Sequence, residues 1–138
     1  MEWAALISWV LTAGGGFILL TIWLRNGGMS QRAAGEIKPY LILSHFGLAA
    51  TGLLLWIIYV ATDSDALAWI AFVLLLVVAL LGFTMFAIWY QRRNPSAGAT
   101  PAPQSGAPAE QRFPVAVVGL HGLLAVITVV LVFIATIG

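Results

Sequence analysis

Four long stretches in which nearly every position is apolar dominate the pattern of this chain. They cover residues 3–24, 39–61, 66–90 and 114–137, and shorter polar segments separate them. About 20 helical residues cross a hydrocarbon layer roughly 30 Å thick, so each stretch is long enough to span a bilayer. Helices that are apolar on all sides must be covered on all sides, by lipid or by each other. The pattern therefore predicts an all-α integral membrane protein, a four-helix up-down-up-down bundle in contact with the lipid bilayer.

Composition agrees with this prediction and removes several classes of protein. Of the 138 residues, 62% are hydrophobic and 8% are charged, more apolar surface than a water-soluble core of this size can bury. The absence of cysteine excludes disulfides, iron–sulfur clusters and the attachment of a c-type haem. The first stretch follows Met1 and Glu2 with no basic segment and no clear cleavage site, so we expect a retained helix instead of a signal peptide.

The charged residues predict an orientation in the membrane. All six basic residues fall in two loops, Arg25, Arg32 and Lys38 in one and Arg92, Arg93 and Arg112 in the other. The opposite side carries only the acidic residues Glu2, Asp63 and Asp65. The positive-inside rule then places loops 25–38 and 91–113 in the cytoplasm and both termini outside, in a bacterial cytoplasmic (inner) membrane. Segment 94–111 is rich in Pro, Ala, Gly and Ser, which predicts a disordered cytoplasmic linker.

The chain also contains an internal repeat. The segments GFILLTIWLRN (16–26) and GFTMFAIWYQR (82–92) share the pattern G-F-x-x-x-x-I-W. Spans two and four each begin with a proline, Pro39 or Pro114, which we expect at the first helical position, and then carry HFGLAAT (45–51) or HGLLAVIT (121–128). These matches predict a tandem duplication of a two-helix hairpin, with residues 1–62 as the first transmembrane hairpin and 63–138 as the second.

The repeat places the two histidines of the chain, His45 and His121, in equivalent positions inside spans two and four. An ionisable side chain is costly in hydrocarbon and marks a functional site by default. Sequential helices of such a bundle are neighbours, so these two spans lie diagonally, with their axes roughly 11–14 Å apart. Two imidazoles facing each other across this diagonal leave room for one metal atom at the centre of a flat macrocycle.

The residues around the histidines fit such a ring. Small side chains follow each histidine on the same face, and glycines of the repeated G-F pattern lie at a similar depth, so we expect the ring beside Ala49, Gly52, Ala125, Thr128, Gly16 and Gly82. Acidic arms of the ring would pair with Lys38 and Arg112 at the cytoplasmic side. The second nitrogen of each imidazole would bond a carbonyl one turn earlier in its own helix, or the Ser44 hydroxyl.

This plan resembles the small b-type cytochrome subunits of membranes, among them the cytochrome b561 proteins and the haem-bearing anchors of succinate and formate dehydrogenases. The resemblance covers the four-helix plan and the pair His45 and His121. It implies one haem b with these histidines as metal ligands, a quinone or a redox protein as electron partner, and a place as electron-carrier subunit of an oxidoreductase in a larger respiratory complex or a homo-oligomer. Many of those proteins hold two haems, whereas this chain has ligands for one, so it would not carry electrons across the membrane alone.

Other interpretations remain open at this level. The histidines can be interhelical hydrogen-bond partners in a cofactor-free accessory subunit of a larger complex, or each can hold a chlorin in a pigment-binding subunit. They can also line a quinone pocket with Tyr40, Ser44 or Thr51. A bare zinc or copper site lacks ligands, because two histidines fall short of the usual four. No span contains the Asp, Glu, Lys or Arg of a proton-coupled transporter, and no motif indicates nucleic acid or catalysis by this chain alone.

Overall fold

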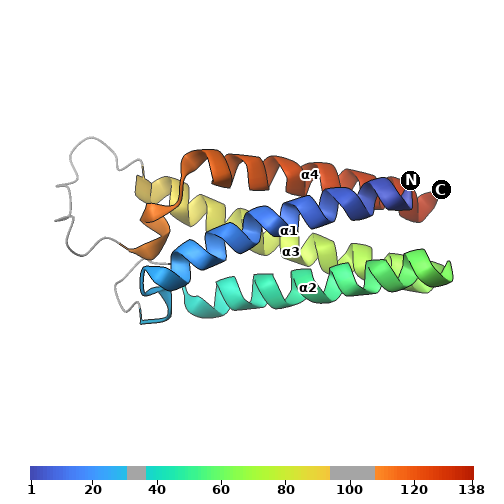
Figure 1. The fold of residues 1–138 in the computed structure, drawn as a ribbon, viewed down its shortest axis with the longest axis horizontal. Coiled ribbons are helices and arrows are strands. Elements are labelled where there is room, and N and C mark those ends of the chain that lie inside the picture. The colour runs from blue at the N-terminus through green and yellow to red at the C-terminus, as the bar shows by residue number, and fades with distance from the viewer. Residues whose placement is uncertain (31–36, 94–107) are drawn as a thin grey trace.

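The computed structural model is a bundle of four long helices, and it describes residues 1–30, 37–93 and 108–138. Successive helices run in opposite directions along the bundle (Figure 1). Each is long and apolar enough to cross a membrane. The ends of the helices agree with those of the predicted spans to within three residues. The agreement is close because the length of an apolar stretch is enough to predict a membrane span. The helices are α1 (Glu2–Arg25), α2 (Pro39–Thr62), α3 (Asp65–Arg93) and α4 (Val115–Ile137).

Local chemistry explains where the helices begin and end. Pro39 is the first residue of α2, where its missing N–H removes no helical hydrogen bond. Pro114 instead precedes α4 as its N-cap, one position earlier than predicted. Asp63 ends α2 in the left-handed conformation (φ 52°), and its N–H bonds the carbonyl of Tyr59. This cap reverses the chain tightly into α3.

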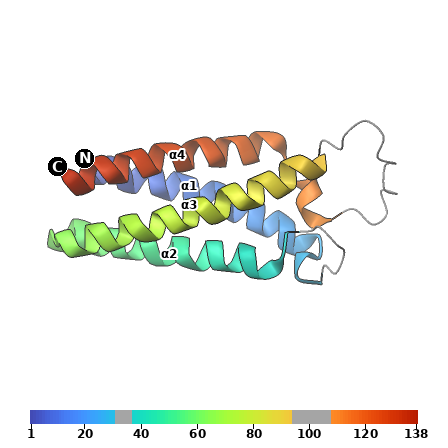
Figure 2. The ribbon, with the colours of Figure 1, turned by 180° about the vertical axis from the view of Figure 1, so that it is seen from behind.

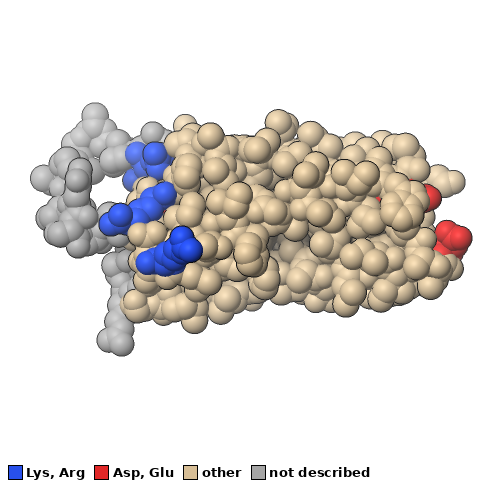
Figure 3. Space-filling view, in the orientation of Figure 1, with Lys and Arg blue, Asp and Glu red and all other residues tan. Residues whose placement is uncertain are grey.

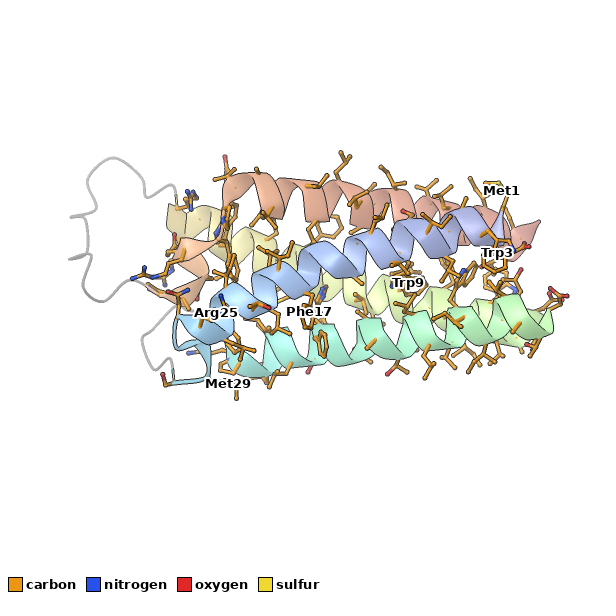
Figure 4. The ribbon with its side chains drawn as sticks, viewed as in Figure 1. Met1, Trp3, Trp9, Phe17, Arg25 and Met29 are labelled. Carbon is orange, nitrogen blue, oxygen red and sulfur yellow. The ribbon has the colours of Figure 1, made fainter. Side chains whose placement is uncertain are left out.

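Opposite charges mark the two ends of the bundle. Lysine and arginine side chains gather at one end and acidic side chains at the other in the space-filling view (Figure 3). We call these the basic end, which carries Arg25 and Lys38, and the acidic end, which carries Asp63 and Asp65. Met1 and Trp3 lie at the acidic end, and Arg25 and Met29 at the basic end (Figure 4). Arg32 lies outside the described residues.

The helices pack as two close pairs, α1 with α4 and α2 with α3. The helices that bear the histidines, α2 and α4, lie on opposite sides of the bundle and diverge from the acidic end toward the basic end (Figures 1 and 2). The diagonal placement of α2 and α4 therefore holds in the structure.

The packed core lies in the half of the bundle near the acidic end. Trp9 of α1 points toward α2 (Figure 4) and rests on Gly52, where a Cβ atom would lie 3.1 Å from the indole ring. The Trp56 indole donates a hydrogen bond of 3.3 Å to the carbonyl of Glu2. The buried members of this core are Ala5, Trp9, Trp56, Ala68, Ala71, Leu75 and Val132.

The outward surface is made of large apolar side chains. Phe17, Leu80 and Leu123 are each about 60% exposed or more, while alanines fill contacts between helices. Alanines at helix contacts and large apolar side chains on the outer surface are typical of helices that pack within lipid, because small side chains let backbones approach closely. A bilayer environment accounts for both features.

A short helix at the basic end corrects the sequence prediction for the linker. Residues Ala109–Arg112 form a 3-10 helix, η3, within the segment predicted to be disordered through residue 111. It lies across the basic end between the ends of α1 and α3 (Figures 1 and 2). Glu110 is fully buried and accepts the backbone N–H of Ile37 at 3.0 Å. The prediction was wrong for residues 109–111 because it rested on composition, which does not reveal that one residue, Glu110, is buried. Residues 94–107 of the predicted linker lie outside the described residues.

Candidate functional site

The two histidines meet inside the bundle although 76 positions separate them. His45 extends from α2 and His121 from α4, and their ring centroids are 6.3 Å apart with the ring planes inclined by 67°. His45 lies six residues after the start of α2, about 9 Å along the helix from the basic end. Both side chains are half-buried. The structure thus brings together the pair that the repeat predicted.

Each imidazole is fixed by a hydrogen bond to the backbone of its neighbouring helix. Nδ1 of His121 lies 2.9 Å from the carbonyl oxygen of Thr12, and Nδ1 of His45 lies 3.0 Å from that of Val78. A carbonyl only accepts, so both Nδ1 atoms carry the proton and donate. The neutral Nε2 atoms then have free lone pairs, and within the described parts of the chain no hydrogen bond reaches them.

These bonds differ from the predicted ones, which were placed within the same helix or at Ser44. The reason lies four residues beyond each accepting carbonyl, at Gly16 and Gly82. A helical side chain tilts toward the N-terminus and covers the preceding turn, so a glycine leaves the carbonyl one turn earlier accessible. The repeated G-F pattern thus exposes Thr12 and Val78 to the imidazoles.

The same glycines make room for the imidazole rings themselves. A Cβ atom on Gly16 would lie 3.0 Å from Cε1 of His121, and one on Gly82 would lie 3.2 Å from Cε1 of His45. Gly15 is the next closest, at 3.4 Å from Cβ of His121. The sequence predicts Gly16 and Gly82 beside the edge of a macrocycle. In the structure Gly16 lies against the ring of His121, and Gly82 lies against the ring of His45.

The other predicted ring contacts separate into two groups. Ala49 and Ala125 follow the histidines by one turn and are half-buried, whereas the space beside Gly52 is taken by Trp9. Thr128 is buried in a hydroxyl cluster, 2.8 Å from the Ser8 hydroxyl and 3.0 Å from that of Thr12. Gly52 and Thr128 therefore serve helix packing in this structure.

Sequence reasoning missed this hydroxyl cluster. Ser8 and Thr12 are one turn apart on a single helix face in an otherwise apolar span, which was the available signal. Their partner on α4 could be found only once the helix pairing was known.

The predicted basic contacts lie at the basic end. Lys38 is the N-cap of α2 and Arg112 is the last residue of η3, and both are exposed. Lys38 precedes His45 by seven residues, about two helical turns.

The two imidazoles of this site are too few to hold a bare metal ion, but they would be enough for a metal already bound in a macrocycle. In the described ranges there is no group of three or more His, Cys, Asp or Glu side chains that could hold a metal ion. Two neutral imidazoles on opposite sides of one metal, with metal–nitrogen bonds of about 2 Å, have centroids about 6 Å apart. The observed separation of 6.3 Å, between rings in an edge-to-face contact, matches this distance.

Comparison of the chain with protein-family models, with curated proteins and with solved structures finds no match. The functional interpretation therefore depends on the geometry of the histidine pair and its surroundings.

Proposed function

We propose that this protein is a membrane electron-transfer subunit that binds a single haem b, with His45 and His121 as the two axial ligands. The observation that carries the proposal is the contact between the two imidazoles, with 6.3 Å between the ring centroids and with Nδ1 of each ring bonded to a carbonyl. Histidines that ligate metals almost always donate the other ring N–H to a carbonyl, a carboxylate or water, which fixes the tautomer and the ring orientation.

The number of ligands favours a macrocycle over a bare ion. Two imidazoles leave four positions of a six-coordinate metal to be filled, and the described residues offer no further ligand group nearby. A porphyrin supplies four nitrogens in a plane between two axial histidines. Six-coordinate iron with two protein ligands suits electron transfer and disfavours oxygen binding.

Packing around the pair supports the same conclusion. On α2 the buried residues are Gly52 and Trp56, and on α4 they are Thr128 and Val132, all on the acidic-end side of the histidines. From the histidines to the basic end, neither helix buries a residue, and the two helices diverge there (Figures 1 and 2). A flat ring between the pair α1/α4 and the pair α2/α3 would supply the missing contacts in this half.

The environment of the protein completes the proposal. The positive-inside rule places the basic end, and with it the haem side of the bundle, at the cytoplasmic face of a bacterial inner membrane. Electrons would pass between the haem and a quinone or a partner redox centre in a larger membrane complex. Within this function the chain binds and orients the cofactor, and His45 and His121 hold its metal.

Visible spectra of the detergent-purified protein, expressed with haem supplied, test the proposal. We expect a sharp Soret band and split α/β bands on dithionite reduction. The variants His121→Ala and His121→Asn should both lose this six-coordinate spectrum. The asparagine amide can still donate to the Thr12 carbonyl, so it preserves the cross-helix bond while removing the ligand nitrogen. A colourless wild-type protein would refute the proposal.

One observation favours a second function, that of a cofactor-free accessory subunit. The histidine hydrogen bonds join α4 to α1 and α2 to α3, the role expected of structural histidines. In that case His121→Asn should retain the stability of the wild type, His121→Ala should lose it, and neither protein should absorb visible light. The same two variants thus separate the two functions.

A further inference from the structure

All four buried side-chain polar atoms that lack a hydrogen-bond partner in the described parts of the chain belong to the basic end of the bundle. They are Nε1 of Trp23, Nε1 of Trp89, Oε2 of Glu110 and Nε2 of Gln111. A buried polar group without a partner costs free energy and calls for an explanation such as a ligand or ordered water. Their concentration at one end makes the basic end the place where a polar ligand would find partners.

The two tryptophans occupy matched places relative to the histidines. Trp23 follows Gly16 by seven residues on α1, and Trp89 follows Gly82 by seven residues on α3. Seven residues make nearly two full turns, so each indole lies on the same helix face as the glycine that contacts a histidine, about 10 Å closer to the basic end. Trp23 is 0% exposed and Trp89 is 4% exposed.

The types of the unpartnered atoms indicate which kind of ligand could bind at the basic end. Three belong to nitrogen donors, two indoles and one amide, and one belongs to a carboxylate oxygen. Donors therefore exceed acceptors, which calls for a ligand rich in acceptors. The lysine and arginines at this end add positive charge around the site (Figure 3), which favours an acidic ligand. A carboxylate, with acceptor capacity on both oxygens and a negative charge, meets both demands.

We infer that the indole N–H groups of Trp23 and Trp89 bind the two carboxylate arms of the ring held by His45 and His121. This inference rests on the proposed haem function. Both arms of a haem b extend from the same edge of the ring, and two donors at the same depth on α1 and α3 suit such a pair. The indoles thereby set which edge of the ring faces the basic end. Lys38 and Arg112 are both exposed, so they could reach the carboxylate arms only from the surface of the protein.

Titration of the haem-free, full-length protein in detergent with two iron porphyrins tests this role. One is haem b itself and the other is its dimethyl ester, in which both carboxylates are masked. The wild type should bind haem b at least about tenfold more tightly than the ester. Trp23→Phe and Trp89→Phe should each weaken haem b binding by about tenfold or more and leave ester binding unchanged. Trp56→Phe is the matched control, because it removes a buried indole N–H at the acidic end.

The outcomes separate this inference from the function on which it rests. Wild-type protein that binds neither porphyrin overturns both. Wild-type protein that binds haem b and the ester equally tightly overturns the carboxylate role alone, and this comparison needs no variant to fold. If the phenylalanine variants bind haem b and the ester more weakly by the same factor, the indoles serve packing only. If they bind both porphyrins as tightly as the wild type, groups other than the indoles hold the carboxylate arms.

Discussion

The ring planes of His45 and His121 are inclined by 67°, close to perpendicular. Each ring is held at that angle by its own carbonyl, Val78 for His45 and Thr12 for His121. Rings that kept this inclination while holding the iron of the proposed haem would leave two iron d orbitals close in energy, and the ferric protein would then give a strongly anisotropic low-spin signal. We expect the electron paramagnetic resonance spectrum of the oxidised, haem-loaded protein to show this signal. A rhombic signal typical of parallel rings would contradict the observed orientation.

Gly16 controls the position of the His121 ring. A methyl group at this residue would lie 3.0 Å from Cε1 of the imidazole, so Gly16→Ala should displace the ring and weaken its bond to the Thr12 carbonyl. We expect a smaller low-spin fraction in the visible spectrum of the variant. Gly14→Ala is the control, because a Cβ atom there meets nothing within 4 Å and alanine favours the helix by up to about 1 kcal/mol. Equal spectra for the two variants would show that the glycine does not position the ligand.

The histidine pair and the four spans were predictable because each depends on one strong physical term. Apolar length alone defines a membrane span. The cost of an imidazole in hydrocarbon singles out His45 and His121 with no knowledge of their surroundings. The repeat then placed the two residues at one depth, and their separation in the bundle follows from the diagonal position of α2 and α4.

The partners of the imidazoles were not predictable in the same way. Whether a carbonyl on the neighbouring helix is within reach depends on how two helices cross, which the composition of either helix leaves open. The burial of Glu110 has a similar origin. The helical turn η3 forms in a Pro- and Ala-rich segment because it packs on the ends of α1 and α3, and these contacts cannot be read from the sequence of the segment itself.

Crowding near the histidines should reduce the amount of bound cofactor. Ala49 follows His45 by one turn and is half-buried, so Ala49→Leu should place a larger side chain beside the proposed ring. We expect lower haem content per protein while the chain still inserts in the membrane. Ala50→Leu, at the adjacent exposed position, should retain the wild-type haem content. Full occupancy in both variants would place the ring away from this turn.

The buried hydroxyl of Thr128 should contribute measurably to helix packing. It lies 2.8 Å from the Ser8 hydroxyl and 3.0 Å from that of Thr12, and it donates to the carbonyl of Leu124 within its own helix. Thr128→Val keeps the shape and removes the cross-helix bonds, so we expect a loss of about 0.5–1.5 kcal/mol in the free energy of unfolding. Unfolding in mixed micelles with increasing sodium dodecyl sulfate measures this loss. Thr84→Val, which removes only a bond within one exposed helix turn, should change the value little.

Glu110 should protect the backbone just before α2 from exchange with solvent. Its Oε1 atom accepts the N–H of Ile37 at 3.0 Å, and both residues are buried. Glu110→Ala removes this acceptor, which leaves a buried N–H unpaired and should lower stability by about 1–3 kcal/mol. Hydrogen exchange at the Ile37 amide, followed by mass spectrometry, should become faster in this variant. Glu110→Gln retains an acceptor oxygen at the same position and should keep the exchange slow. Fast exchange already in the wild-type protein would show that η3 does not cover the basic end in solution.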